Sequence, residues 1–435
     1  MITAQQQVKD LLDFIDNSPS PYHAVKNIEE KLSAFDFKRL NETEKWDLKP
    51  GSRYFIVRDD SSIIFFVLGK KPLSETGYRI LGAHTDSPGL KIKPNAVNNA
   101  DGLLRLGVEV YGGPILATFT DRDLSLAGRI SYKAASGDIA SRLVRFDQAL
   151  LRLPNLAIHM NRKVNEDGLK LHKQTELPLI LAVAVEQQLS EKYLHNLLVK
   201  ASDIDAHDIL SWELSVYDTQ KGVFWGDNKQ FYADSQLDNL ASCHAGMQAL
   251  LDENTLNSDN TLVCAFFDHE EIGSESTKGA SGCFLPDVLQ RIGFAMDVDK
   301  EDYQRALARS FMISADMAHA YQPNFPSAYE PEHKVTVNRG PVIKVNANHR
   351  YSSESLSEAM FISWCEASEV PYQKYSHRAD IPCGSTIGPM TSAKLGIRTV
   401  DVGNPMWAMH SIRESAGVED HCYMIKVLNT FFSVE

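Results

Sequence analysis

The sequence has few cysteines and no long apolar run. Its 435 residues include six cysteines, all from Cys243 onward and none in a CxxC pair. Few, unpatterned cysteines in a long chain are typical of a reduced protein, so we predict a cytoplasmic location. The longest apolar runs, such as IIFFVL at 63–68, are too short to cross a bilayer. The first residues, MITAQQQVKDLLDF, lack the pattern of a secretory signal peptide.

Clustered positive charge is also missing. The net charge is −13, and no group of lysines and arginines forms a basic segment. A nucleic-acid partner is therefore not expected, because phosphate binding depends on such groups, and no membrane partner is expected either. A chain of this length with 43% hydrophobic and 23% charged residues is long enough to bury a large core and to divide into two domains.

The hydrophobic pattern predicts an α/β domain with an insertion. The runs SSIIFFVLG (61–69) and YRILGA (78–83) are nearly continuous, which is typical of central strands in a sheet covered by helices on both faces. Residues 95–235 contain shorter, alternating and glycine-richer runs such as LLRLGVEVYGG, which favour β structure. We therefore predict an α/β domain with a mixed sheet, formed by residues 1–94 and 236–435, and interrupted by a β-rich domain at 95–235.

Residues that bind metals follow the predicted strands of the α/β domain. In open α/β sheets the ligand site lies outside the carboxyl ends of the strands, so residues at these positions are expected to converge. The candidates are His84 after ILGA, Asp238 ahead of a predicted helix, Glu270 and Glu271 after CAFF, Asp316 after MISA and His410 after VDVG. The sequence thus predicts one site built from segments more than 300 positions apart.

Two histidines and three carboxylates suit zinc or a related borderline cation. Two Zn²⁺ ions would balance the charges of Asp238, Glu271, Asp316 and one hydroxide, so that burial would not isolate a large net charge. A pair of metals of this kind activates a shared water. We therefore predict two Zn²⁺ per subunit, with Co²⁺ or Mn²⁺ as alternatives at one position.

Two further acids have predicted roles beside the metals. A metal-bound histidine usually donates its second N–H to a carboxylate, carbonyl or water, and Asp86 lies two residues from His84. Burying two adjacent glutamates costs free energy because their charges repel, unless the two side chains have different roles and different protonation states. We expect one of Glu270 and Glu271 to bind metal, while the other transfers a proton as general base and acid.

Each motif alone has a more ordinary interpretation. A histidine after a strand is often hydrogen-bonded in a loop, and an aspartate before a helix is usually an N-cap. Two glutamates in sequence usually begin a solvated helix. Their joint occurrence at successive strand ends favours a metal site.

The order of the motifs resembles that of the aspartyl aminopeptidase family, a family of two-zinc metallo-aminopeptidases. The resemblance covers nearly the whole chain and is carried by SPSPYHAV, AHTDSPGLKIKP, NLAIHMNR, SQLDN, FDHEEIGSES, SADMAHA, KVNANHRY, IPCGSTIGP and GNPMWAMHSIRE. It implies that His84 and Asp316 bind one zinc, that Glu271 and His410 bind the other, and that Asp238 bridges them. It also implies that Glu270 is the general base and that Asp86 orients His84.

The resemblance also implies a substrate and an assembly. Members release N-terminal amino acids from peptides with a free N-terminus, often Asp or Glu, and Lys344 with Tyr351 would meet the acidic side chain. The insert would be a dimerisation domain that places His159 in the active site of a neighbouring subunit. The expected homo-oligomer is a dodecamer built from dimers.

Other functions remain open at the level of the sequence. The same metals could serve an aminopeptidase with neutral or basic preference, an N-deacylase or carboxypeptidase, or a phosphoesterase. A peptide-binding assembly without catalysis is a further alternative, although it would have no use for a general base. Peptides with free and with acetylated N-termini distinguish an aminopeptidase from a deacylase.

Overall fold

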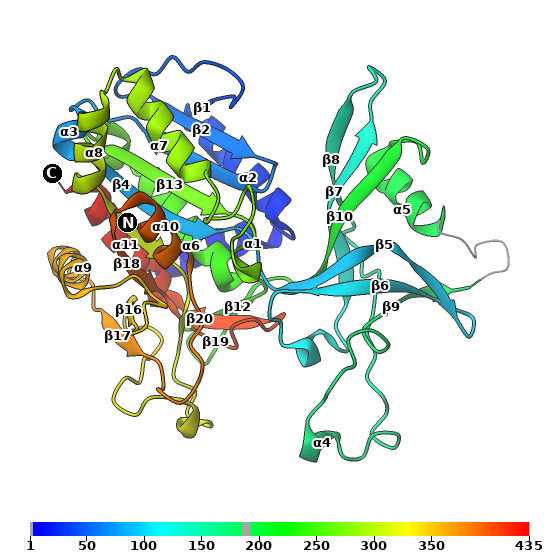
Figure 1. Cartoon of the computed structure of the whole chain (residues 1–435). Coiled ribbons are helices and arrows are strands. Elements are labelled where there is room, and N and C mark those ends of the chain that lie inside the picture. The colour runs from blue at the N-terminus through cyan, green and yellow to red at the C-terminus, as the bar shows by residue number, and fades with distance from the viewer. Residues whose placement is uncertain (1–2, 185–191, 435) are drawn as a thin grey trace.

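The computed structural model describes residues 3–184 and 192–434, and the largest sheet in this part of the chain is mixed (Figure 1). Its order is β1-β2-β3-β13-β4-β14-β18-β16-β17. These strands are β1 (Lys38–Arg39), β2 (Arg53–Arg58), β3 (Ser62–Val67), β4 (Tyr78–His84), β13 (Thr261–Phe267), β14 (Phe311–Ala315), β16 (Val342–Val345), β17 (Gln373–Ser376) and β18 (Arg398–Gly403). β13, β4, β14 and β18 run parallel to their neighbours in this group, whereas β3 is antiparallel to β13.

Strand β3 shows why the apolar runs are continuous. Phe65 packs into the core on one face of the sheet, and Phe66 packs into the core on the other face. All six residues of the strand are buried. Because successive side chains point to opposite faces, a strand covered on both faces needs an apolar residue at nearly every position.

Helices cover both faces of this sheet, which confirms the predicted fold class. One face packs against α2 (Pro21–Ala34), α6 (Leu237–Leu250), α9 (Ser355–Ala367) and α11 (Val418–Ser433). The other packs against α3 (Leu73–Thr76), α7 (Phe284–Ala295), α8 (Lys300–Arg309) and α10 (Ile387–Leu395).

A second, antiparallel sheet forms a separate lobe, which lies to the right in Figure 1. Its order is β8-β7-β10-β5-β6-β9. The strands are β5 (Gly89–Ala100), β6 (Leu103–Tyr111), β7 (Leu124–Lys133), β8 (Ile139–Arg145), β9 (Leu179–Val183) and β10 (Ile209–Asp218). This lobe has its own apolar core, to which α5 (Lys192–Ser202) contributes Leu194 and Leu198. A short helix, α4 (Val164–Asp167), lies on a long excursion from the lobe.

A small third sheet joins segments that are far apart in the sequence. It has the order β11-β12-β20-β19-β15, with β11 (Val223–Trp225), β12 (Phe231–Asp234), β15 (Ala318–His319), β19 (Pro405–Trp407) and β20 (Glu414–Gly417). Helix α1 (Ala4–Asp16) packs its apolar face against this sheet. The sheet thereby places β20 next to the beginning of α6 and next to the candidate metal ligands Asp238 and His410.

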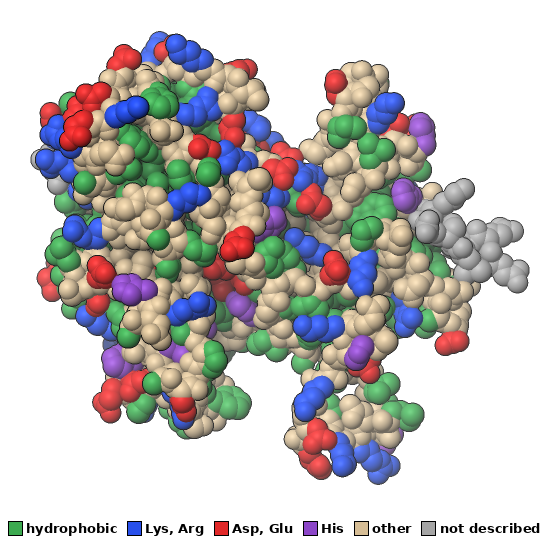
Figure 2. All heavy atoms as spheres, in the orientation of Figure 1, with side chains coloured by type: hydrophobic (Ala, Val, Ile, Leu, Met, Phe, Trp, Pro, Cys, Tyr) green, Lys and Arg blue, Asp and Glu red, His purple; other side chains and the backbone are tan. Residues whose placement is uncertain are grey.

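The surface carries charges of both signs. On the face shown in Figure 2, basic and acidic side chains are interspersed over both lobes. Within the residues that the structure describes, none of the helices has the length and apolar character needed to cross a membrane.

Candidate metal centre

The carboxyl ends of neighbouring parallel strands bring the candidate residues together. His84 is the last residue of β4, Asp316 follows β14, and Glu270 and Glu271 lie in the short 3₁₀ helix after β13. Because β13, β4 and β14 are adjacent and parallel, their ends meet at one edge of the sheet. Asp238, near the beginning of α6, faces the same edge through its contacts with the histidines.

Two groups of potential ligand atoms share Asp238. His84, Asp238 and Asp316 form one group, and Asp238, Glu271 and His410 form the other, each with its atoms within 4.8 Å of one another. Asp238 Oδ1 lies 3.4 Å from His84 Nε2, whereas Asp238 Oδ2 lies 3.5 Å from His410 Nε2. Each oxygen of Asp238 therefore faces a different imidazole.

The remaining distances complete the two groups. His84 Nε2 is 3.8 Å from Asp316 Oδ1, and His410 Nε2 is 3.5 Å from Glu271 Oε2. Ligand atoms about 2.0 Å from a tetrahedral ion are roughly 3.3 Å apart, so these separations fit atoms arranged around a cation. They are longer than good hydrogen bonds.

An unsatisfied oxygen supports the same interpretation. Asp238 Oδ1 is buried and has no hydrogen-bond partner among the described residues. A buried carboxylate oxygen without a donor is costly unless a cation neutralises it. The donor set of imidazole nitrogens and carboxylate oxygens is one that zinc accepts, so the residues present fit zinc.

The second nitrogen of each histidine has a partner. His84 Nδ1 is 3.0 Å from the main-chain oxygen of Asp86 and 3.4 Å from its carboxylate. His410 Nδ1 is 3.1 Å from the main-chain oxygen of Gly113, which belongs to the second lobe. These contacts favour the tautomer in which Nε2 is free to bind a metal.

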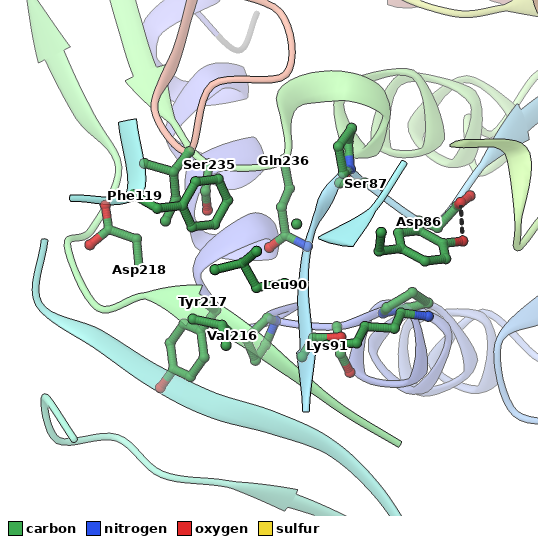
Figure 3. Close-up of a pocket in the computed structure, with 18 of the residues that line it drawn as sticks. Asp86, Ser87, Leu90, Lys91, Phe119, Val216, Tyr217, Asp218, Ser235 and Gln236 are labelled. Carbon is green, nitrogen blue, oxygen red and sulfur yellow. Dashed lines mark hydrogen bonds between the residues drawn. The ribbon is translucent and has the colours of Figure 1, made fainter. Parts of the chain in front are cut away.

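The Asp86 carboxylate also holds the two glutamates. It accepts hydrogen bonds from the main-chain N–H of Glu270 and of Glu271, each at 3.1 Å. The hydroxyl of Tyr111 donates a third, at 2.7 Å to Oδ2, drawn as the dashed line at Asp86 in Figure 3. Burial raises the pKa of Tyr111, and the neighbouring Asp86 raises it further, so the hydroxyl keeps its proton.

Crowding of carboxylates perturbs the acids at the site. Burial, with further contributions from Asp316 and Asp86, raises the pKa of Glu270 to about 8. Burial and Asp238 likewise raise the pKa of Glu271 well above its ordinary value. Burial opposes protonation of His84, but its carboxylate neighbours outweigh this effect and raise its pKa. Such a concentration of negative charge favours the binding of cations.

Glu414 is a buried residue of the site that the sequence reasoning missed. It lies in β20 and accepts hydrogen bonds from the main-chain N–H of Asp238, at 3.1 Å, and of His410, at 2.6 Å. One carboxylate thus joins two segments that carry potential ligands. Its position four residues after His410 is the only signal in the sequence, and it does not reveal the contact with Asp238.

The three predicted substrate-binding residues lie in different places. The buried Lys344 has its ammonium 3.5 Å from Asp316 Oδ2 and 5.2 Å from the centre of the Tyr351 ring, so both residues lie beside the ligand groups. His159 instead lies in an exposed turn of the second lobe and is not one of the residues that converge here.

An α/β fold with paired histidines and carboxylates at its strand ends is typical of metal-dependent hydrolases. The family described as aminopeptidase I zinc metalloprotease (M18) matches residues 14–432. A probable M18 family aminopeptidase 2 of Stutzerimonas stutzeri is 47% identical over 425 residues, which are 97% of each chain. The chain belongs to the M18 family of zinc aminopeptidases, which confirms the resemblance seen in the sequence.

Solved structures agree with this assignment. The chain resembles one in a complex of Ape4 and Nbr1, with a TM-score of 0.95 and 39% identity, over 99% of this chain and 86% of that one. It also resembles a chain of the yeast mApe1 dodecamer, with a TM-score of 0.85 and 28% identity, over 98% of this chain and 95% of that one. The M18 fold is thus retained over essentially the whole chain.

Proposed function

We propose that this protein is a two-zinc aminopeptidase that releases N-terminal Asp or Glu from peptides. The observation that carries the proposal is Asp238, whose two oxygens face two different histidines and whose buried Oδ1 has no hydrogen-bond partner among the described residues. A carboxylate in this position can bridge two cations. In this proposal His84 and Asp316 complete one zinc position, and Glu271 and His410 complete the other.

Zinc, when bound, would polarise the scissile carbonyl and lower the pKa of the attacking water. Glu270 then acts as the general base: it takes the proton from the water and passes it to the leaving amine. Asp86 acts on Glu270 indirectly, by holding its main-chain N–H.

The acidic preference rests on Lys344. Its side chain is buried, and its ammonium lies 3.5 Å from Asp316 and also donates to the main-chain oxygen of Met317 at 3.1 Å. A substrate carboxylate that reaches this ammonium would gain a charge-assisted hydrogen bond beside the ligand groups. Tyr351, whose ring lies against Lys344, would limit how the substrate side chain enters.

The proposed assembly is a dodecamer built from dimers through the insert. One M18 structure is described as a dodecamer, and this chain matches it over 98% of its length. His159 is flanked by three exposed apolar side chains, Leu156, Ile158 and Met160, which are 68%, 49% and 76% exposed. An exposed apolar segment of this kind is typical of an interface. We propose that it places His159 in the active site of a neighbouring subunit.

A substrate panel on zinc-loaded protein tests this function. Dipeptides that begin with Asp, Glu, Leu, Lys or Ala are compared, each with a free and with an acetylated N-terminus. We expect rapid cleavage of the free Asp and Glu substrates and no cleavage of the acetylated ones. Preference for Leu or Lys would contradict the role of Lys344. Cleavage of acetylated substrates would favour a deacylase, and no cleavage at all would favour a peptide-binding protein.

A further inference from the structure

The last residue of β6 reaches the metal centre from the second lobe. Tyr111 is buried, and its hydroxyl donates to Asp86 Oδ2 at 2.7 Å. The same carboxylate accepts the main-chain N–H groups of Glu270 and Glu271. Tyr111 therefore supplies the third donor that fixes Asp86, and it comes from the other lobe.

The ring of Tyr111 is itself held in place. The ammonium of Lys91 lies 3.8 Å from the centre of the ring, at a distance that permits a cation–π interaction. The centre of the His269 ring, from the segment that precedes Glu270, lies 6.4 Å from the centre of the Tyr111 ring. In Figure 3, Lys91 extends from β5 towards the side on which Asp86 lies. The tyrosine is thus fixed by both lobes.

The two glycines after Tyr111 continue the contact. Gly112 has φ +65°, and a Cβ at this position would lie 3.1 Å from Glu271 Cβ and 3.2 Å from the Glu271 main-chain oxygen. Glycine therefore lets the main chain of this segment pass close to Glu271, where a side chain would crowd it. The main-chain oxygen of Gly113 lies 3.1 Å from His410 Nδ1, and the N–H of Ile115 donates to the main-chain oxygen of His410 at 2.9 Å.

We propose that the segment Tyr111–Gly113 of the insert is a positioning element of the metal centre. Its tyrosine holds the Asp86 carboxylate, which lies 3.4 Å from His84 Nδ1, and its Gly113 oxygen lies 3.1 Å from His410 Nδ1, so one short segment supports residues of both proposed zinc positions. The insert then has a role in metal binding in addition to assembly. This inference rests on the two-zinc function proposed above.

Outer contacts of this kind change metal affinity without contacting the metal. Loss of a hydrogen bond that orients a metal ligand typically lowers metal affinity or activity about 10- to 100-fold. Tyr111→Phe removes only the hydroxyl and keeps the ring. Because Asp86 would then lose a donor while still holding Glu270 and Glu271, the metal positions should loosen without collapsing.

The test compares zinc retention in the full-length, zinc-loaded protein. A chromogenic chelator is titrated into wild type and Tyr111→Phe, and zinc bound per subunit is measured at each chelator concentration. We expect Tyr111→Phe to release zinc at about 10-fold lower chelator concentration. At saturating zinc we expect a lower kcat with KM within about twofold, because the Asp86 carboxylate that holds the Glu270 main-chain N–H is less firmly fixed, whereas Lys344 is untouched.

Tyr217→Phe is the matched control. The Tyr217 hydroxyl also makes a hydrogen bond within the second lobe, to the main-chain oxygen of Phe146 at 2.6 Å, but it does not contact Asp86. This variant should lose a similar amount of thermal stability and retain zinc like wild type. Equal zinc retention in Tyr111→Phe and wild type would overturn the inference, as would equal losses in both variants.

A second variant covers the case in which Tyr111→Phe does not fold. Gly112→Ala places a methyl group against Glu271 and keeps the tyrosine, so it should also lower zinc retention; wild-type retention in this variant would overturn the inference. The proposed function fails separately: wild type would then bind fewer than two zinc ions, or would release no amino acid from a free peptide.

Discussion

At the scale of single residues, the centre depends on what each carboxylate contacts. Asp238 lies near the beginning of α6, where an aspartate is usually an N-cap, but its oxygens face His84 and His410 instead. Glu414, whose pKa is raised to about 8 by burial and by Asp238, instead accepts main-chain N–H groups. Carboxylates of the same chemical type thus take different proposed roles, as a metal ligand, a general base or a support for the main chain, because their burial and their contacts differ.

A pair of buried histidines away from the metal centre should make the protein sensitive to acid. His421 in α11 and His244 in α6 contact each other, with Nε2 to Nδ1 at 2.9 Å, and Asp10 lies 3.2 Å from His244 Nε2. Burial lowers the pKa of His421 well below its ordinary value, and His244 lowers it further. Below a pH of about 6.5 the unfolded chain binds a proton that the folded protein excludes, so stability falls as the pH falls.

Replacing His421 by Gln should flatten this dependence. The free energy of unfolding is measured at pH 7.5 and pH 5.5 in the same metal state. We expect the loss between the two values to shrink, by at most about 1.4 kcal/mol per pH unit for one titrating group. His207→Gln removes a histidine whose side chain is 79% exposed and should leave the loss unchanged. An unaltered pH dependence in His421→Gln would contradict the assignment of His421.

At the scale of the elements, the sequence predicts what depends on local pattern. The continuous apolar runs of β3 and β4 identify central strands, and the residues that follow parallel strands are brought to one edge by the geometry of the sheet. The sequence therefore predicts that His84, Glu271 and Asp316 lie near one another. The predicted α/β class with helices on both faces is confirmed for the same reason.

Contacts between distant elements could not be predicted in this way. Periodicity shows which face of a strand is buried, but it does not show which element covers that face. The third sheet pairs β12 with β20, and the hydroxyl of Tyr111 enters from the second lobe. The sequence does not reveal the roles of Glu414 and Tyr111. Glu414 contacts Asp238, and Tyr111 contacts Asp86, only because separate sheets pack together.

At the scale of the whole molecule, we propose that the second lobe contributes to two active sites: the one in its own subunit and the one in a neighbouring subunit. Its Tyr111–Gly113 segment contacts the metal centre of its own subunit, while His159 lies in an exposed turn and is not among the residues that converge there. An assembly in which each active site needs residues of two subunits is incomplete as a monomer. This property can be tested by mixing variants.

Two inactive variants should restore activity when they assemble together. Glu270→Gln lacks the proposed base, and His159→Ala lacks the side chain offered to the neighbour. In a randomly mixed oligomer, about a quarter of the sites would combine an intact Glu270 with an intact His159 from a neighbour. We expect coexpressed subunits to recover up to that fraction of wild-type turnover, measured by release of Asp from a free dipeptide.

The separate variants, mixed only after purification and without subunit exchange, are the control and should stay inactive. If coexpressed oligomers contain both variants but recover no turnover, this result would contradict the proposal that His159 of one subunit completes the active site of its neighbour. Full activity of His159→Ala alone would contradict it as well.

The most direct test of the proposed function joins zinc content and turnover in Glu270→Gln. Zinc per subunit is measured on full-length protein together with release of Asp from a free dipeptide, and Glu275→Gln, an exposed residue after the same 3₁₀ helix, is the control. We predict that Glu270→Gln keeps two zinc ions and the wild-type fold but loses turnover by about 10²- to 10⁴-fold. Turnover within about tenfold of wild type, with both zinc ions bound, would contradict the assignment of Glu270 as the base.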